Sequence, residues 1–263
     1  MKTALDALYD SFNAPDTAAD PIQIVRRYGD VRDREIVAFI AAGLAFGRVA
    51  SVLASIETIC ALMGPSPAAF VRAFDAKRDG PRFATFVHRW VRGKEVTALF
   101  VTLRKMLDAF GSLEACFASG YDEAHEDLAP AIEAFSARTG KSYFFAKPST
   151  GSACKRMNLF LRWMIRRDGV DPGGWTMIPA SKLTVPLDTH TIRVGKCLRL
   201  TRRASPGWKM AADITAGLRK LDPSDPVRYD FALCHLGMMG SCGYGTKQRD
   251  AHCPLKPHCR PRR

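Results

Sequence analysis

Two residues near the middle of the chain have side chains suited to catalysis. Lys155 and Asp188 each stand where the sequence predicts the start of a helix. A neutral lysine amine is a nucleophile, and a nearby carboxylate stabilises developing positive charge or accepts a proton. Each residue also has an ordinary structural interpretation, Lys155 as a solvated helix residue and Asp188 as an N-cap. Their roles therefore depend on the sequence around them.

The sequence predicts a helix that begins just before Lys155. Gly151 follows Pro148 and Thr150, which is typical of a turn. After the turn, apolar residues recur at helical spacing, namely Met157, Phe160, Leu161 and Met164. The opposite side of this helix carries a polar face made of Lys155, Asn158, Arg162 and Arg166.

A second helix is expected to begin at Asp188. Pro186 precedes it, and an apolar run follows it, made of Ile192, Val194, Cys197 and Leu198. The composition between residues 167 and 185 shifts to Gly, Pro, Asp and Ser, which indicates an irregular connection. We expect Trp175 and Ile178 to anchor this connection, and Trp163 to be a core residue.

The remaining chain reads as helices throughout. The segment from Ile36 to Leu44 is nearly all apolar and suits a buried helix, and Asp225-Pro226 is a favourable start for a last helix that ends at Met239. Further helices are expected over residues 49–63, 96–110, 112–115, 128–135 and 210–221. No stretch shows convincing strand alternation. We therefore predict an all-α fold with about ten helices.

Charge favours a polyanionic partner. The chain has 39 basic and 26 acidic residues, a net charge of +13, which favours nucleic acid, although many basic proteins bind none. No apolar run reaches the eighteen or so residues that cross a bilayer, and the N-terminus lacks the pattern of a signal peptide. We therefore expect a cytoplasmic, nucleoid-associated protein without a membrane partner, whose eight cysteines do not form disulfides.

Two motifs resemble the helix-hairpin-helix DNA glycosylases. The stretch from Gly151 to Asn158 is similar to their Leu-Pro-Gly-x-Gly-x-Lys-x-Ala-Asn pattern, without its second glycine, and Val185 to Val194 is similar to their Val-Asp-Thr-His-x-x-Arg-Val. The segment order resembles endonuclease III. Within the superfamily, the stretch from Ser152 to Trp175 followed by PLDTHT resembles an uncharacterised bacterial family of unknown function.

The resemblance implies a fold and a set of residue roles. It implies one glycosylase-like unit over residues 1–263 with two helical lobes and a cleft between them, residues 1–45 plus 186–263 and residues 46–185. It implies Lys155 as nucleophile, Asp188 as acid/base partner, and base excision with lyase activity on duplex DNA by a monomer. The long interval between Lys155 and Asp188 resembles that of archaeal 8-oxoguanine glycosylases, which points to an oxidised purine as the substrate. The expected DNA contacts are Phe46, Arg48, Gly151, Ser152, Arg156, Arg162, His190 and Arg193.

The cysteines near the C-terminus form a separate motif. Their spacing is Cys234-x7-Cys242-x10-Cys253-x5-Cys259, and the last three resemble members of the iron-sulfur loop of endonuclease III relatives. Three interpretations stay open: an iron-sulfur cluster, a zinc site that uses His252 or His258, and a loop that binds no metal. Basic residues in this segment suit phosphate contact, namely Lys247, Arg249, Lys256, Arg260, Arg262 and Arg263.

Two other functions compete with the glycosylase. One is a DNA-binding module without catalysis, in which the lysine and aspartate are structural. The other is a metal-dependent regulator built around the cysteine segment.

Overall fold

The computed structural model describes residues 1–15, 19–139, 142–239 and 253–259. It is 59% helix and 2% strand, with 13 α-helices in the described ranges, so the predicted all-α fold is confirmed. The helices are α1 Lys2–Phe12, α2 Ile22–Val25, α3 Val31–Leu44, α4 Val49–Met63, α5 Pro67–Ala73, α6 Ala76–Asp79, α7 Gly93–Phe110, α8 Leu113–Ala118, α9 Ala129–Ala137, α10 Lys155–Ile165, α11 Thr189–Cys197, α12 Trp208–Arg219 and α13 Asp230–Met238.

Helix α3 lies at the centre of the larger group of helices. Every residue from Glu35 to Leu44 is buried, as its apolar sequence predicts. The helix contacts α2, α4, α5, α8 and α10. Asp30 caps its N-terminus by accepting a hydrogen bond from the backbone N–H of Arg32 at 2.8 Å.

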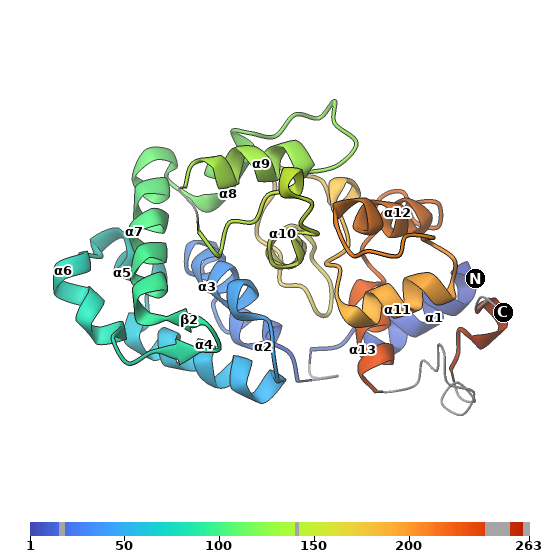
Figure 1. Ribbon diagram of the computed structural model, residues 1–263, viewed down its shortest axis with the longest axis horizontal. Helices are drawn as coiled ribbons and strands as arrows, with labels where there is room; N and C mark the ends of the chain where they lie inside the picture. The colour runs from blue at the N-terminus through green and yellow to red at the C-terminus, as the bar shows by residue number, and fades with distance from the viewer. Residues whose placement is uncertain (16–18, 140–141, 240–252, 260–263) are drawn as a thin grey trace.

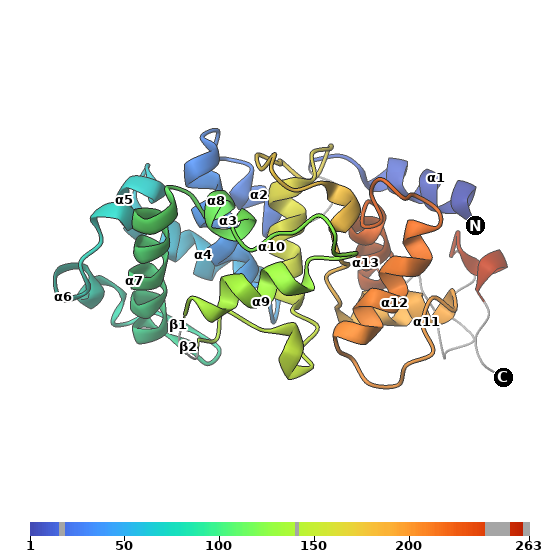
Figure 2. The same cartoon turned by 90° about the horizontal axis from the view of Figure 1, so that it is seen from above.

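The molecule is elongated, and α10 lies near its middle (Figure 1). Helices α5 to α7 lie at one end, whereas α1 and α11 to α13 lie at the other end with both termini (Figures 1 and 2). Helix α1 contacts α13, but α2 and α3 contact the middle helices. The contacts therefore group residues 22–44 with the middle helices, unlike the expected lobe of residues 1–45. The division into two glycosylase-like lobes stays a prediction.

The last helix begins later than the sequence indicated. The predicted start at Asp225 is wrong, because α13 begins at Asp230. Asp225 instead accepts hydrogen bonds from Arg166 Nε at 2.9 and 3.0 Å. Asp225 therefore forms an ion pair with Arg166 and does not cap α13.

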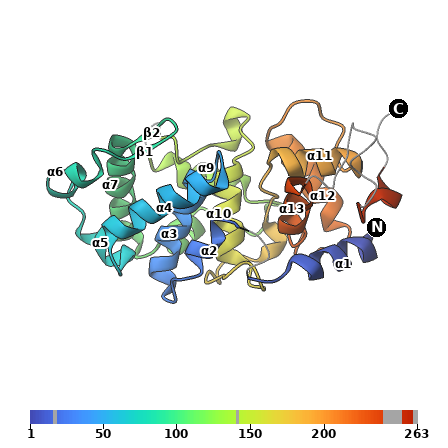
Figure 3. The same cartoon turned by 90° about the horizontal axis from the view of Figure 1, so that it is seen from below.

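A small β-hairpin was not predicted. Strands β1 Val87–His88 and β2 Val91–Arg92 pair in antiparallel register before α7. The hairpin lies beside α4 and the start of α7 (Figure 3). Strands of two residues are too short to show alternation in a sequence.

No single helix in the described ranges is long and apolar enough to cross a membrane. Helices α4 and α5 together have the length and apolar composition of a membrane span, but the pair is bent by 64°.

Candidate active site around Lys155 and Asp188

Lys155 is the first residue of α10, as predicted. A short turn over Pro148–Thr150 leads to Gly151, which has φ +80° and ψ −1°. Cys154, the residue before the helix, also has a left-handed conformation, with φ +48°. A positive φ is uncommon for a residue other than glycine, and such residues gather at functional sites. The backbone conformation at Cys154 therefore directs the chain into a helix that starts with the lysine.

The Lys155 amine is held against the end of another helix. Its Nζ donates a hydrogen bond to the backbone oxygen of Ala45 at 3.3 Å. Ala45 is the C-cap of α3, where unpaired carbonyl groups concentrate negative charge. The side chain is partly buried, so the amine lies at the junction of α3 and α10.

Asp188 caps the N-terminus of α11, as predicted. Its Oδ1 accepts a hydrogen bond from the backbone N–H of Thr191 at 2.7 Å. Its Oδ2 accepts a second hydrogen bond from Cys234 Sγ at 3.0 Å. The contact with Cys234 comes from α13, and no motif in the sequence indicated it. Both carboxylate oxygens are therefore fixed in position.

The environment of Asp188 favours its charged form. Burial raises the pKa of this carboxyl, but the hydrogen bonds from Cys234 and Thr191 and the charges of Lys155 and His190 outweigh burial. The net result is a pKa below the ordinary value of 3.8. Asp188 is therefore ionised at neutral pH, and the charge of Lys155 acts on its carboxylate, so the two predicted residues lie within electrostatic reach of each other.

The neighbouring thiols are poor nucleophiles. Burial, followed by the negative charges of Asp188 and Asp230, raises the pKa of Cys234 well above its ordinary value. Burial also raises the pKa of Cys154 to about 11. Because the thiolate is the reactive form, neither cysteine is a good nucleophile at neutral pH.

A buried ion network joins α10 to α13. Arg162 donates hydrogen bonds to Asp171 at 3.0 Å and to Asp230 at 2.6 Å, and its side chain is 3% exposed. Asp230 also accepts a hydrogen bond from Thr191 Oγ1 at 3.4 Å. Since Thr191 donates to Asp188, the network fixes α11 and α13 relative to the helix that carries Lys155.

The connection between α10 and α11 folds back over α10. The backbone N–H groups of Gly173 and Trp175 donate to the carbonyl groups of Trp163 and Met164 at 3.1 and 2.8 Å. The Trp175 indole is 4% exposed, and its Nε1 donates to Glu35 at 3.1 Å. Trp175 therefore anchors this connection, as predicted. Ile178 is 3% exposed, and Trp163 is a core residue at 0% exposed.

The polar face of α10 is mostly internal, which corrects one expectation. Arg162 and Arg166 are both buried in ion pairs with aspartates, and Asn158 is 1% exposed. The prediction that Arg162 contacts DNA is wrong, because its guanidinium is already neutralised by two carboxylates. A buried ion network and a solvated basic face have the same helical spacing in a sequence.

The other expected DNA contacts lie at several places around Lys155. Arg156 lies over the Tyr143 ring at 3.6 Å, and its Nη2 donates to the Tyr143 backbone oxygen at 2.7 Å. Phe46 follows Ala45 directly, and Arg48, two residues after Phe46, is exposed. Ser152 is partly buried and accepts a hydrogen bond from the Cys154 backbone N–H at 3.1 Å.

His190 and Arg193 lie on α11. Gly237 of α13 packs against His190 so closely that an added Cβ would lie 2.7 Å from the His190 Cβ. His190 Nδ1 is buried and has no hydrogen-bond partner among the described residues. Arg193 is partly buried. The histidine therefore stands beside Asp188 with a ring nitrogen left unpaired.

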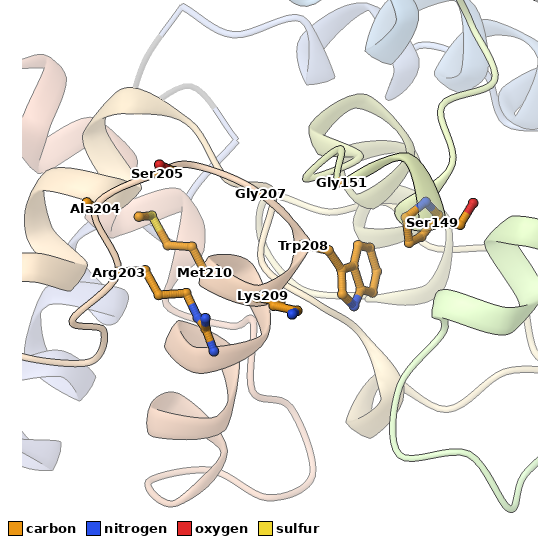
Figure 4. Close-up of a pocket in the computed structure, with 10 residues that line it drawn as sticks. Ser149, Gly151, Arg203, Ala204, Ser205, Gly207, Trp208, Lys209 and Met210 are labelled. Carbon is orange, nitrogen blue, oxygen red and sulfur yellow. The ribbon is translucent and has the colours of Figure 1, made fainter.

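A cavity of about 690 Å³ adjoins the turn before α10 (Figure 4). Ser149 and Gly151 line one side, and Trp208 and Lys209 at the start of α12 line the other. The Trp208 Nε1 donates to Asp127 at 3.3 Å. Gly207 must be a glycine here, because an added Cβ would lie 2.8 Å from the Gly151 oxygen. This cavity was not predicted, although Pro206-Gly207 before a helix is a pattern typical of a turn.

The cysteine segment is only partly described, and it corrects two expectations. Cys259 forms a disulfide with Cys197, at a Cα–Cα distance of 5.0 Å, so the prediction of reduced cysteines is wrong for this pair. The fold brings the end of α11 to the C-terminal segment, within the distance that a disulfide spans. Cys259 is therefore not available as a thiolate ligand.

The remaining members of the predicted metal site do not meet in the described ranges. Cys234 donates to Asp188, and Cys253 is a buried residue of the C-terminal segment. Cys242, His252, Lys247, Arg249, Arg260, Arg262 and Arg263 lie outside the described residues. No group of three His, Cys, Asp or Glu side chains among the described residues is placed to hold a metal ion.

The described residues define a helical protein with an amine and a carboxylate at the starts of two consecutive α-helices, α10 and α11. A family model matches residues 20–239, and it is described as a protein of unknown function, DUF2400. The chain belongs to this family. No curated protein and no solved structure gives a match.

Proposed function

We propose that the protein is a DNA glycosylase with lyase activity, which removes a damaged base from duplex DNA through Lys155 and Asp188. The observation that carries the proposal is the position of Lys155 and Asp188 at the starts of two helices, where the charge of the lysine lowers the pKa of the carboxyl. The helix-hairpin-helix resemblance of both motifs supports it. The net charge of +13 suits a polyanionic substrate.

The proposed reaction uses each residue for one task. Lys155 first loses its ammonium proton to water, and the amine then attacks C1′ of the sugar. The glycosidic bond breaks with its electron pair leaving on the base, which takes up a proton from water. Asp188 stabilises the positive charge that develops on the sugar and accepts the proton lost by the attacking nitrogen. After the sugar ring opens, Lys155 and C1′ form an imine. Water then releases the amine, or loss of the 2′ proton and the 3′ phosphate breaks the strand.

The enlarged connection between α10 and α11 resembles that of archaeal 8-oxoguanine glycosylases, and on this ground we propose an oxidised purine as the substrate. The base must leave the duplex to reach an amine that is only partly exposed. The cavity beside Gly151 lies next to the turn that would contact the phosphate backbone, and Lys209 on its far side adds a positive charge.

Release of free base tests the proposal. Duplexes that contain 8-oxoguanine or uracil are incubated with the wild type, with Asp188→Asn and with Asp75→Asn. Asp75 is a matched control, because it also caps a helix, α6, by accepting from the backbone N–H groups of Lys77 and Arg78 at 2.9 Å. We expect base release by the wild type and by Asp75→Asn, and a loss of at least a hundredfold in Asp188→Asn, as for removal of a transition-state electrostatic contact.

Two outcomes would favour the competing functions. Salt-sensitive DNA binding that is unchanged by Asp188→Asn, with no base released from any lesion, would favour a DNA-binding module without catalysis. A stoichiometric metal content would favour a metal-dependent regulator. The second alternative has less support, because Cys259 is bonded to Cys197.

A further inference from the structure

An exposed aromatic patch lies beside Lys155, made of Phe46, Trp90 and Tyr143. The Phe46 and Trp90 rings are stacked, with centroids 4.5 Å apart and an angle of 21° between their planes. Tyr143 meets both rings edge-on, at 5.7 and 5.9 Å. Trp90 is 59% exposed, which is unusual for so large an aromatic side chain. One flat face of an indole is therefore covered by Phe46, while much of the remaining ring is open to solvent.

The β1–β2 hairpin that carries Trp90 is fixed in place. His88 is 3% exposed, and its two ring nitrogens form hydrogen bonds with Ser55 Oγ at 2.8 Å and with the Phe46 backbone oxygen at 3.2 Å. The strands pair in the register Val87 with Arg92 and His88 with Val91. The exposed indole is therefore held on a short rigid support and not on a loose loop.

Positive charge surrounds the aromatic patch. Arg48, Arg89 and Arg92 are all exposed. None of the three side chains has a carboxylate partner within ion-pair distance among the described residues. Arg89 has φ +57°, and its Nε lies 3.3 Å from the position of a Cβ added to Gly47. Guanidinium groups around an exposed ring match the phosphates and bases of a nucleic acid.

The patch is continuous with the candidate active site. Phe46 directly follows Ala45, whose backbone oxygen accepts the hydrogen bond from Lys155 Nζ. Tyr143 contacts Arg156, the residue after Lys155, through its ring and its backbone oxygen. Phe46 is thus next in sequence to the residue that binds the Lys155 amine, and Tyr143 contacts the residue next in sequence to Lys155.

We propose that Trp90 is a stacking platform for a nucleobase of the bound DNA, at the point where the strand enters the site of Lys155. The exposed indole stacks on the base, Phe46 supports the indole from behind, and the three arginines hold the flanking phosphates. This inference rests on the proposed function for its substrate, but it concerns binding and not bond cleavage. The base that stacks on Trp90 would be a neighbour of the damaged base that has left the duplex.

DNA binding by the Asp188→Asn protein tests the proposal without turnover. The probe is a duplex with an abasic-site analogue, labelled with 2-aminopurine opposite the analogue, and affinity is measured by fluorescence anisotropy at fixed salt. Trp90→Ala is expected to weaken binding about 5- to 150-fold, the range for loss of one base–aromatic stack. Trp90→Phe is expected to recover most of the affinity. Val87→Ala is the matched control, since Val87 is on the same hairpin and is also 59% exposed, and it should bind as the parent does.

The outcomes separate this inference from the proposed function. Unchanged affinity of Trp90→Ala, or an equal loss in Val87→Ala, would overturn the stacking platform even if the wild type releases bases. A loss confined to Trp90→Ala would support it even if the wild type releases none. If the parent protein binds no DNA at all, both proposals fail.

Discussion

Cys234 Sγ donates a hydrogen bond to Asp188 Oδ2 over 3.0 Å, and this contact links α13 to the N-cap of α11. The thiol stays protonated because burial and the charges of Asp188 and Asp230 raise its pKa. Asp188 is in turn kept ionised by the donors around it. The cysteine is therefore a positioning residue for the carboxylate, and its predicted role as a metal ligand is not needed to explain its place.

Removal of the thiol should change the pH dependence of base release. In Cys234→Ala the carboxylate loses a donor that lowers its pKa, so the acid limb of the kcat/KM profile should move to higher pH. Cys234→Ser supplies a hydroxyl donor and should return the acid limb to its wild-type pH. Cys116→Ala, at a buried cysteine on α8, is the control. An unshifted limb in Cys234→Ala would show that the thiol does not act on Asp188.

The charge of Asp188 should also affect stability. Because its pKa is lowered in the folded state, the carboxylate contributes stability above its unfolded pKa of about 3.9, and this contribution is lost as the pH falls through the folded pKa. Asparagine is also a good N-cap, so Asp188→Asn isolates the charge. In urea unfolding at pH 7, the free energy of unfolding of the wild type should exceed that of this variant, and the difference should decrease as the pH falls through the folded pKa of Asp188. A stability difference that does not depend on pH would contradict a stabilising role for the Asp188 charge.

The buried ion network should make a large contribution to stability. Arg162→Ala leaves Asp171 and Asp230 buried without this partner, which should cost about 3–5 kcal/mol of unfolding free energy. Arg27→Ala breaks the exposed pair with Glu57 and should cost at most about 1 kcal/mol. Chemical denaturation measures both values. Similar values for the two variants would mean that the network does not fix α10 to α13.

The approach of α11 to α13 requires a glycine. Gly237→Ala would place a Cβ 2.7 Å from the His190 Cβ. Either α11 must then shift, or the free energy of unfolding must fall by about 1–3 kcal/mol. Base release should fall with stability, since Asp188 lies at the start of α11. Gly29→Ala is the control, because nothing lies within 4 Å of its added Cβ. Equal thermal stability of both variants would contradict this account.

Much of the fold followed from local signals. Apolar residues predicted α3, α4, α7 and α10, and the cap at Asp188 was located correctly. The errors arose where a residue's role depends on contacts with residues distant in sequence. Helical spacing could not show that Arg162 faces two aspartates and not solvent, and Asp225 has the sequence of a cap but pairs with Arg166.

The candidate site was predictable only in part. Lys155 and Asp188 stood in motifs, but Cys234 reaches Asp188 from a helix distant in sequence. Trp90 was missed because its strands are two residues long and carry no periodic pattern. The bond between Cys197 and Cys259 depends on where the C-terminal segment packs, which spacing does not determine.

The central claim is that Lys155 forms a covalent bond with the sugar, and borohydride trapping tests it most directly. A duplex with 8-oxoguanine or an abasic site is incubated with protein and sodium borohydride, which reduces an imine to a stable amine that is seen as a slow band on a denaturing gel. We predict trapping by the wild type and by Lys105→Ala, an exposed lysine on α7, and none by Lys155→Ala. Trapping by Lys155→Ala at the wild-type level, or no trapping by the wild type on any lesion, would contradict the account.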